Sequence, residues 1–593
     1  MDISAAPRAT YDQRLAERTL LLQSFQGRRA RLGTLRLLVF LIAAALLWLT
    51  RWYWIALPLA VFIALVWFQS RAERAAECAR RAMRFYERGI ARLENRWHDS
   101  KTESGERFRD PHHPYAADID LFGHASLFQL LSTARTASGE KRLASWLLTP
   151  ASIDQLRARH QAVDELRPLL DLRERIVVLG DDVAAKTNPD HLKDWAVQPA
   201  RIFPKPLRAL ALSLSVLALG ALLWCFATNL ADPNARLALI ATGLIEALLA
   251  VPLRNRILAI VASVEEPAHD LELLSQILAA LETQQFHSPL LAALRQSISM
   301  DGRPASTRIA QLRKLTDLLD SRENPIVRAL GPVILWTTQV GMTVEAWRAE
   351  NGPYVPAWIH AVAEIEALSA LANYAWEHPN DPFPEFVSDR PLFEADHLGH
   401  PLLPDNRCVR NSVSLRPPLR LLIVSGSNMS GKSTLLRTIG VNTVLALAGA
   451  PVRAKRLVLS PLSLGASIQT TDSLEEGQSR FMAEILRLKK ILELPHPALF
   501  LLDELLGGTN SHDRALGSEG LIRALLDRGA IGLVTTHDLS LARVADDLAP
   551  AAANVHFEDR LEAGRLVFDY TMRPGVVTRS NALDLMRAVG LDV

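Results

Sequence analysis

The sequence predicts an α/β domain at the carboxyl-terminal end of the chain, preceded by an all-α region and two transmembrane helical hairpins. Three observations lead to this fold class: four long apolar spans that come in two pairs, helical periodicity around and after those pairs, and short apolar runs after residue 396 that end at glycine or acidic residues. The chain has 593 residues, of which 49% are hydrophobic and 22% charged, so it is long enough for several structural units and apolar for its size.

Charge and cysteine content argue against two classes of protein. The net charge of +2 gives no global basic field, so any contact with nucleic acid must come from a local patch. The three cysteines, Cys78, Cys225 and Cys408, lie far apart in the chain, which argues against a disulfide framework. No CxxC or His/Cys spacing indicates a zinc site.

The four apolar spans cover residues 37–50, 52–68, 209–231 and 237–253. A helix needs about 20 apolar residues to cross the hydrocarbon core of a bilayer. The third span meets this length, the second and fourth nearly do, and the first needs its flanking residues. Glu246 interrupts the fourth span, where a carboxylate would either pair within the helical bundle or mark a functional polar site. The alternative is that these spans are buried helices of a large soluble core.

Basic residues flank both pairs of spans. Arginines precede residue 37 and follow residue 68, and further basic residues stand before residue 209 and after residue 253. By the positive-inside rule, the outer ends of both hairpins lie in the cytoplasm. We therefore expect a multi-pass protein of the cytoplasmic (inner) membrane, with the lipid bilayer as a partner and the carboxyl-terminal domain in the cytoplasm.

The expected domain layout follows from these spans and from the helical periodicity of stretches such as LELLSQILAALETQQF. It comprises an amino-terminal cytoplasmic helix, a first transmembrane hairpin, a basic juxtamembrane helix with a linker, the first part of a helical core, a second transmembrane hairpin, a helical lever and the α/β domain. In that order their boundaries are 1–34, 35–69, 70–114, 115–204, 205–253, 254–395 and 396–593.

A phosphate-binding loop follows the buried-strand pattern at residues 420–425. The stretch GSNMSGKST has the P-loop spacing and leads into a helical pattern, which is the strand, loop and helix context that the motif requires. Its backbone N–H groups would surround phosphates, Lys432 would reach the β- and γ-phosphates, and Ser433 would bind Mg²⁺. The expected ATP-binding residues of this loop are Gly426, Ser427, Asn428, Met429, Ser430, Gly431, Lys432, Ser433 and Thr434.

Two later strand patterns end in residues suited to hydrolysis. ALFLL is followed by Asp503 and Glu504, the Walker B arrangement, in which Asp503 holds Mg²⁺ and Glu504 orients or deprotonates the attacking water. AIGLVTT is followed by His537, at the strand end where such folds place their ligands. Glu504, Lys432 and His537 are the expected catalytic residues of an ATPase that converts ATP and water to ADP and phosphate.

These motifs resemble those of the MutS family of DNA mismatch-repair ATPases, within the ABC-type ATPase class. The family P-loop GPNMGGKST stands here as GSNMSGKST, the Walker B stretch as DELLGGTNSHD, and the strand-end motif as Thr536-His537. The stretch SLEEGQSRFMAE matches the family's signature region. The resemblance implies ATP and Mg²⁺ as cofactors and a head-to-tail homodimer in which Gly477 and Ser479 complete the partner's ATP site. It also implies DNA as a possible partner.

The resemblance covers about residues 115–200 and 360–593, and the sequence departs from the family at several positions. Gly507 replaces an arginine, Arg480 stands where threonine is common, and Ser427 and Ser430 replace a proline and a glycine. Residues 1–114 are largely a hairpin and a basic helix, so we expect no amino-terminal mismatch-recognition domain.

The sequence therefore favours a membrane-anchored MutS-like ATPase coupled to mismatched or structured DNA, as in DNA mismatch repair. Two alternatives stay open: half of an ABC-type transporter, and an ATP-driven membrane switch that does not act on DNA. The absence of the LSGGQ signature argues against the transporter.

Overall fold

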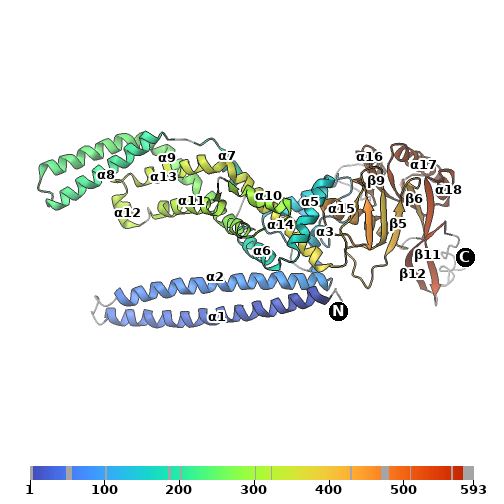
Figure 1. Cartoon of the computed structure of the whole chain (residues 1–593), viewed down its shortest axis with the longest axis horizontal. Helices are drawn as coiled ribbons and strands as arrows, with labels where there is room; N and C mark the ends of the chain where they lie inside the picture. The colour runs from blue at the N-terminus through green and yellow to red at the C-terminus, as the bar shows by residue number, and fades with distance from the viewer. Residues whose placement is uncertain are drawn as a thin grey trace. The chain divides into compact units, whose positions relative to one another are not determined.

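The computed structural model of this chain divides into two compact units, each described here by itself. The first contains residues 1–133, 140–173 and 367–593, and the second contains residues 134–139 and 174–366. Figure 1 shows the secondary structure of the whole chain. The residues that the structure describes are 5–48, 56–99, 103–184, 189–200, 203–300, 302–321, 324–427, 430–468, 480–507, 509–562 and 565–577.

The first unit begins with a hairpin of two long helices that lie side by side, α1 (Ala5–Trp48) and α2 (Ala56–Leu93) (Figure 1). Each helix runs without a break across a boundary expected from the sequence, because the apolar spans near residues 37–68 are only the distal parts of these helices. Apolar side chains in that part are exposed: the exposed fraction is 58% for Leu41 and 52% for Trp67. The proximal part packs instead, with Tyr11 and Tyr86 buried.

A buried ionic network ties the proximal part of this hairpin to helix α14 (Val355–Glu377). The Arg92 guanidinium donates to both carboxylate oxygens of Glu377, at 2.7 Å and 2.6 Å, and the Tyr11 hydroxyl donates to the same carboxylate at 3.1 Å. Gly89 makes the close packing possible, because a Cβ there would lie 2.4 Å from the Tyr11 ring. Bidentate pairs of this kind are strong and directional, so the proximal hairpin has a defined place in the first unit.

Short helical elements connect this hairpin to the nucleotide domain. They are η2 (Trp97–Asp99), η3 (Glu106–Phe108), α3 (Leu127–Leu131), α4 (Ala137–Leu148), α5 (Ile153–Leu166) and α6 (Leu170–Ala184). Ser152 and Gln155 form a capping box at the start of α5, which satisfies two backbone donors. The division into two units falls within α6 and again within α14.

The second unit is almost entirely helical. Its elements are α7 (Pro189–Val197), α8 (Lys205–Ala227), α9 (Pro233–Thr283), α10 (Pro289–Ser297), α11 (Ala305–Asp320), α12 (Pro325–Leu330), α13 (Trp336–Asn351), η5 (Gly352–Tyr354), and the antiparallel pair β1 (Ser299–Met300) and β2 (Arg303–Pro304). Asp232 caps α9 by accepting from Asn234 N at 2.9 Å, and Pro233 occupies the first turn. Helix α9 continues 30 residues beyond the boundary expected at residue 253 and contains two internal prolines.

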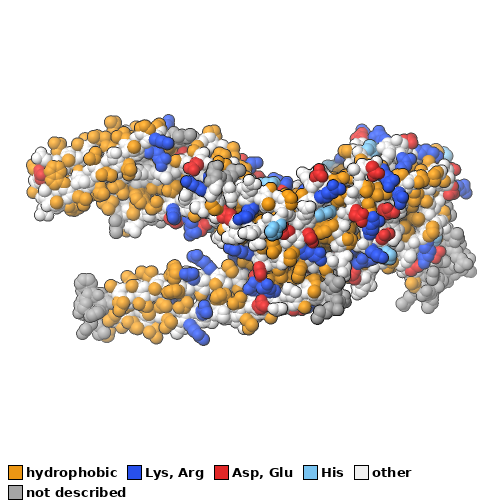
Figure 2. Space-filling view, viewed as in Figure 1, with side chains coloured by type: hydrophobic (Ala, Val, Ile, Leu, Met, Phe, Trp, Pro, Cys, Tyr) orange, Lys and Arg blue, Asp and Glu red, His pale blue; other side chains and the backbone are white. Residues whose placement is uncertain are grey.

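Five helical stretches in the described part of the chain are long and apolar enough to cross a membrane. Four lie in α1, α2, α8 and α9, where 0%, 0%, 33% and 6% of the most apolar window is buried. The fifth spans residues 336–377 and is 78% buried, so its apolar side chains serve a protein interior. Figure 2 shows hydrophobic side chains over α8 and α9 and along the distal hairpin of the first unit.

The nucleotide domain is built on a six-stranded sheet with the order β12-β11-β6-β10-β9-β8. Its strands are β6 (Leu421–Ser425), β8 (Ser463–Ser467), β9 (Ala498–Asp503), β10 (Ile531–Thr536), β11 (Ala552–Glu562) and β12 (Arg565–Pro574). All neighbours are parallel except β11 and β12. Every residue of β6 and β10 is buried, as expected for parallel strands covered on both faces.

Helices cover this sheet and a second sheet adjoins it. The helices are α15 (Lys432–Ala448), α16 (Arg480–Leu492), α17 (Ser511–Asp527) and α18 (Leu539–Asp547). The second sheet has the order β3-β7-β4-β5, from β3 (Glu385–Phe386), β4 (Phe393–Leu398), β5 (Asn411–Leu415) and β7 (Arg456–Leu459). Phe500, Ile522, Leu525 and Val534 form part of the core between the six-stranded sheet and its helices. The carboxyl-terminal region is therefore an α/β domain, as the sequence predicts.

Candidate nucleotide site

The P-loop connects the end of β6 to the start of α15. Gly431 caps the helix in the left-handed region, at φ 107°, where glycine is the favoured residue. The Lys432 ammonium donates to the carbonyl oxygens of Gly426 and Ser427, both at 2.9 Å. This side chain therefore folds back over its own loop, and burial lowers its pKa while the carboxylates of Glu504 and Asp503 oppose that shift.

Two serine hydroxyls in this loop have no hydrogen-bond partner within the described residues. They are the Oγ atoms of Ser427 and Ser430, which are both buried. A buried hydroxyl without a partner is costly, and phosphate oxygens are strong acceptors that would satisfy it. The loop therefore fits a phosphate chain. Asn428 and Met429, which the sequence also assigns to ATP, lie outside the described residues.

The Walker B acids stand at the carboxyl end of β9, beside β10. The register pairs Asp503 with Thr535, whose hydroxyl donates to the Asp503 carboxylate. The same hydroxyl accepts from the backbone N–H of Glu504 at 3.2 Å. Glu504 has a left-handed backbone, at φ 44°, which is uncommon for a residue with a side chain. Thr535 thus holds both acids in place, and the chain turns sharply at Glu504.

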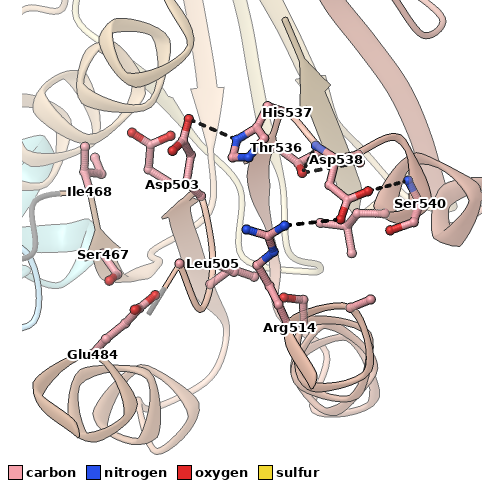
Figure 3. A pocket seen from close by; sticks show the side chains of 15 residues that line it. Ser467, Ile468, Glu484, Asp503, Leu505, Arg514, Thr536, His537, Asp538 and Ser540 are labelled. Carbon is pink, nitrogen blue, oxygen red and sulfur yellow. Dashed lines mark hydrogen bonds and ion pairs between the residues drawn. The ribbon is translucent and has the colours of Figure 1, made fainter. Parts of the chain in front are cut away.

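The Glu504 carboxylate lies between the lysine of the P-loop and the histidine at the end of β10. Its Oε1 is 3.9 Å from Lys432 Nζ and 3.5 Å from His537 Nδ1. Figure 3 shows the His537 side chain directed toward this carboxylate. Three residues that are far apart in the sequence and expected to be catalytic therefore meet at one edge of the sheet, where open α/β folds bind ligands.

A cavity of about 1070 Å³ lies on the P-loop side of these residues. Lys432, Ser433, Thr434, Asp503 and Glu504 all line it. The Ser433 hydroxyl and the Asp503 carboxylate are oxygen ligands of the kind that Mg²⁺ prefers, and they face the same space as the lysine. The residues expected to hold Mg²⁺ therefore fit that ion together with a nucleotide phosphate.

A second hollow, of about 310 Å³, also has Asp503 and Glu504 in its wall (Figure 3). Arg514 and Asp538 form an ion pair at 3.6 Å across it, and Glu484 accepts from the backbone N–H of Leu506 at 2.7 Å. Glu484 belongs to α16, so this helix is bonded to the turn that follows Glu504. A movement of α16 would therefore shift the turn after Glu504 through this hydrogen bond.

Sequence motifs alone do not reveal two residues in the wall of the larger cavity. Tyr570 of β12 lies over the P-loop, because a Cβ on Gly431 would be 3.1 Å from Cδ1 of its ring. Asn411 of β5 holds that part of β12: its amide donates to Tyr570 O at 3.0 Å and accepts from Met572 N at 2.8 Å. The strand pattern around Tyr570 gave no sign of this role, which depends on an antiparallel strand added at the sheet edge.

The signature residues Gly477 and Ser479 lie outside the described residues. The described helix α16 begins next to them, and its Arg487 forms an ion pair with the buried Asp118. Asp118 also accepts from the backbone N–H of Ile468 at 2.7 Å. The helical core that begins near residue 115 is thus bonded directly to the nucleotide domain within the first unit.

A parallel sheet that presents a P-loop, an Asp-Glu pair and a histidine at its strand ends defines a P-loop ATPase domain. Residues 422–592 match MutS domain V. The chain is also 38% identical over 243 residues to "Endonuclease MutS2" of Thermus thermophilus, a match that covers 40% of this chain and 31% of that protein. These matches confirm, for residues 422–592, the resemblance to the MutS family found in the sequence. The chain spans about a third of the length of that curated relative.

Proposed function

We propose that this protein is a membrane-anchored MutS-type ATPase that binds and hydrolyses ATP at a head-to-tail homodimer interface and couples this cycle to mismatched or structured DNA. The observation that carries the ATPase is the position of the Glu504 carboxylate, 3.9 Å from the P-loop lysine and 3.5 Å from His537. These three groups supply a phosphate anchor, a base and a polar group near the γ-phosphate.

The chemistry follows from the roles of these side chains. Lys432 exchanges the carbonyl oxygens of its own loop for β- and γ-phosphate oxygens, which removes the need for its folded-back contacts. Glu504 orients the attacking water and accepts its proton, and His537 contacts the γ-phosphate region. Ser433 and Asp503 would hold Mg²⁺, which would neutralise part of the negative charge that develops on the phosphate oxygens.

Membrane anchoring is proposed from the two hairpins with exposed apolar side chains. The central residues Val216 and Leu217 of α8 are 64% and 59% exposed, and Leu244 and Leu248 of α9 are 66% and 78% exposed. Contiguous apolar surface of this length is rare on a protein in water and normal for one in lipid. We therefore propose that α8 and α9, and the distal parts of α1 and α2, lie in a bilayer.

Dimerisation is proposed from the family resemblance and from the surface of α16. This helix follows the signature stretch and exposes Met482, Ile485 and Leu486, at 49%, 38% and 42%. A row of exposed apolar residues on a helix whose other apolar face packs into the domain core fits a contact with a second subunit. In such a dimer, Gly477 and Ser479 of one subunit would complete the ATP site of the other.

The cycle is tested by the dependence of the ATPase rate on protein concentration. The purified full-length chain should show a rate that rises more steeply than linearly through the dimerisation range. The variant M482E/L486E should keep its fold and lose the steep part of the curve. A strictly linear rate in the wild type across that range would contradict a shared site.

The coupled ligand is a separate question, because an ATP-driven membrane switch that does not act on DNA has the same ATPase site. The rate should be measured with duplex, mismatched and branched DNA at titrated salt, and with anionic and neutral lipid vesicles. Stimulation by DNA that weakens as salt rises would support the DNA proposal. Stimulation by lipid alone would support the switch.

A further inference from the structure

The second unit contains an apolar hollow of about 840 Å³ that has no part in the ATP site. Helix α9 supplies one wall through Gly243, Glu246, Ala247 and Ala250, which repeat at helical spacing and so share one face. Three of these four residues are small, so this face of α9 leaves space open. The other walls come from α8, α12 and the segment that leads into α13.

Among the described residues, Glu246 is the one acidic group that lines this hollow, and it is only 4% exposed. Its Oε1 accepts no hydrogen bond from any described residue. Arg328, the one basic lining residue, is exposed and makes no ion pair with Glu246 in the described part of the chain. A buried carboxyl without a partner is costly, and such groups within apolar spans mark functional sites.

An aromatic ring lines the same hollow. Trp336, the first residue of α13, is half-buried, and its indole N–H donates to Leu318 O at 2.8 Å. This bond uses the only polar atom of the ring, so the rest of the indole presents an apolar, electron-rich surface. An electron-rich ring together with a carboxylate is the combination that recognises organic ammonium and phosphonium ions.

We infer that this hollow binds a hydrophobic organic cation, with Glu246 opposing its charge and Trp336 contacting its body. The volume lies within the range of roughly 300–1,000 Å³ that is typical for sites of drug-sized molecules. The small residues on α9 accommodate the apolar part of the ligand. The site is separate from the ATPase chemistry, and it does not depend on whether the protein acts on DNA.

The test uses tetraphenylphosphonium and the full-length protein in phosphatidylcholine nanodiscs, with equilibrium dialysis as the readout. Neutral triphenylphosphine oxide serves as the uncharged comparison. The wild type should bind the cation saturably, and Glu246→Gln should weaken it about tenfold or more while changing binding of the neutral compound little. Glu265→Gln, an exposed acid on the same helix, is the matched control and should bind like the wild type.

A second pair of variants keeps the test decisive if Glu246→Gln does not fold. A Cβ on Gly243 or on Gly220 would meet nothing within 4 Å, so either glycine accepts a larger side chain. Gly243 lines the hollow and Gly220 does not. Gly243→Leu should therefore reduce binding of the cation about tenfold, and Gly220→Leu should not.

Three outcomes would overturn the inference. They are no saturable binding of the cation by the wild type, equal binding by Glu246→Gln and the wild type, or equal loss of the cation and the neutral compound in Glu246→Gln. The last result would show an apolar groove that is filled by lipid without selection for charge.

Discussion

The strands of the nucleotide domain and the helices α8 and α9 are both rich in aliphatic residues, yet they place them in opposite ways. Every residue of β6 and β10 is buried, whereas the aliphatic side chains of α8 and of the first half of α9 are mostly exposed. In the domain, the polar residues of the nucleotide site lie at the strand ends, around Glu504. In α8, most of the buried residues are small or polar, among them Ala218 and Ser215.

This difference shows that segments of similar aliphatic content can place their side chains in opposite ways. The sheet buries its apolar residues from water and leaves a polar edge, where water and nucleotide can enter. Helix α8 and the first half of α9 present most of their aliphatic residues outward, which fits the bilayer location proposed above. The excess hydrophobicity of the chain thus belongs to these helices and not to an unusually large core.

The largest expected effect concerns the polar edge of the sheet. Lys432→Ala removes charge-assisted bonds to the β- and γ-phosphates, and it should weaken ATP binding roughly 100-fold, or about 3 kcal/mol. Isothermal titration with a slowly hydrolysed ATP analogue measures this. Lys455→Ala, at an exposed position near the second sheet, should bind like the wild type. Unchanged ATP affinity in Lys432→Ala would contradict a role of the P-loop in binding the phosphates.

The exposed helices are tested by a charge at the centre of α8. Val216→Arg should cost about 2.5–3.5 kcal/mol of membrane insertion if α8 lies in a bilayer. At an exposed position in water, the same substitution should change the free energy of unfolding by no more than about 0.5 kcal/mol. Val567→Arg in the nucleotide domain, where Val567 is 43% exposed, is the control for the second case. Labelling of Asn229→Cys, between α8 and α9, by a membrane-impermeant thiol reagent in sealed vesicles measures insertion of this hairpin in each background. Equal labelling with and without Val216→Arg would contradict a bilayer location of α8.

A smaller effect concerns Glu366 on α14. The apolar stretch that contains this helix is mostly buried inside the protein and is not exposed as α8 is. Burial raises the pKa of Glu366 to about 7, although it accepts from Arg135 N at 2.9 Å and Thr136 N at 3.2 Å. Because the folded state holds this proton more tightly than the unfolded chain, its stabilising contribution is present below pH of about 4.5 and is lost as the pH rises through about 7. The loss should amount to about 1–3 kcal/mol.

The measurement is the dependence of the unfolding temperature on pH, in the wild type and in Glu366→Gln. The variant should show a flatter slope between pH 5 and 8. Glu350→Gln, an exposed position on α13, should keep the slope of the wild type. Identical slopes in the wild type and Glu366→Gln would show that this carboxyl does not titrate in the folded protein over that range.

The smallest expected effect concerns the two serines that replace family residues in the P-loop. Ser430→Gly restores the family residue and removes a buried hydroxyl that lacks a described partner. If that hydroxyl contacts phosphate, ATP affinity should fall about three- to tenfold, or roughly 0.5–1.5 kcal/mol. Ser388→Gly, at an exposed position just after β3, is the control and should bind ATP like the wild type. Tighter binding by Ser430→Gly would assign the hydroxyl no role in binding.

Much of the site could be predicted from the sequence because its motifs are local. The P-loop, Asp503-Glu504 and Thr536-His537 each follow a strand pattern, and parallel strands bring their carboxyl ends to one edge. Tyr570 and Thr535 could not be placed in this way, because their roles depend on strand order and register. The register that pairs Thr535 with Asp503 joins segments that are 32 residues apart.

The presence of helices in the amino-terminal part could be predicted from the sequence, but the positions of their ends could not. Apolar runs located the two hairpins, but α1, α2 and α9 each continue far beyond their spans. The reason is that amphipathic and charged turns continue the same helix, and Pro252 and Pro267 do not end α9. The hydropathy of a span shows which part could lie in lipid and does not show where its helix ends.

The most direct test of the central claim is the pair of measurements on Glu504→Gln, namely ATP binding and single-turnover hydrolysis by the full-length protein. The account predicts ATP affinity within a few-fold of the wild type and hydrolysis slowed by roughly 10²–10⁴, because the variant keeps the phosphate anchor and loses the base. Hydrolysis at the wild-type rate by Glu504→Gln would contradict it.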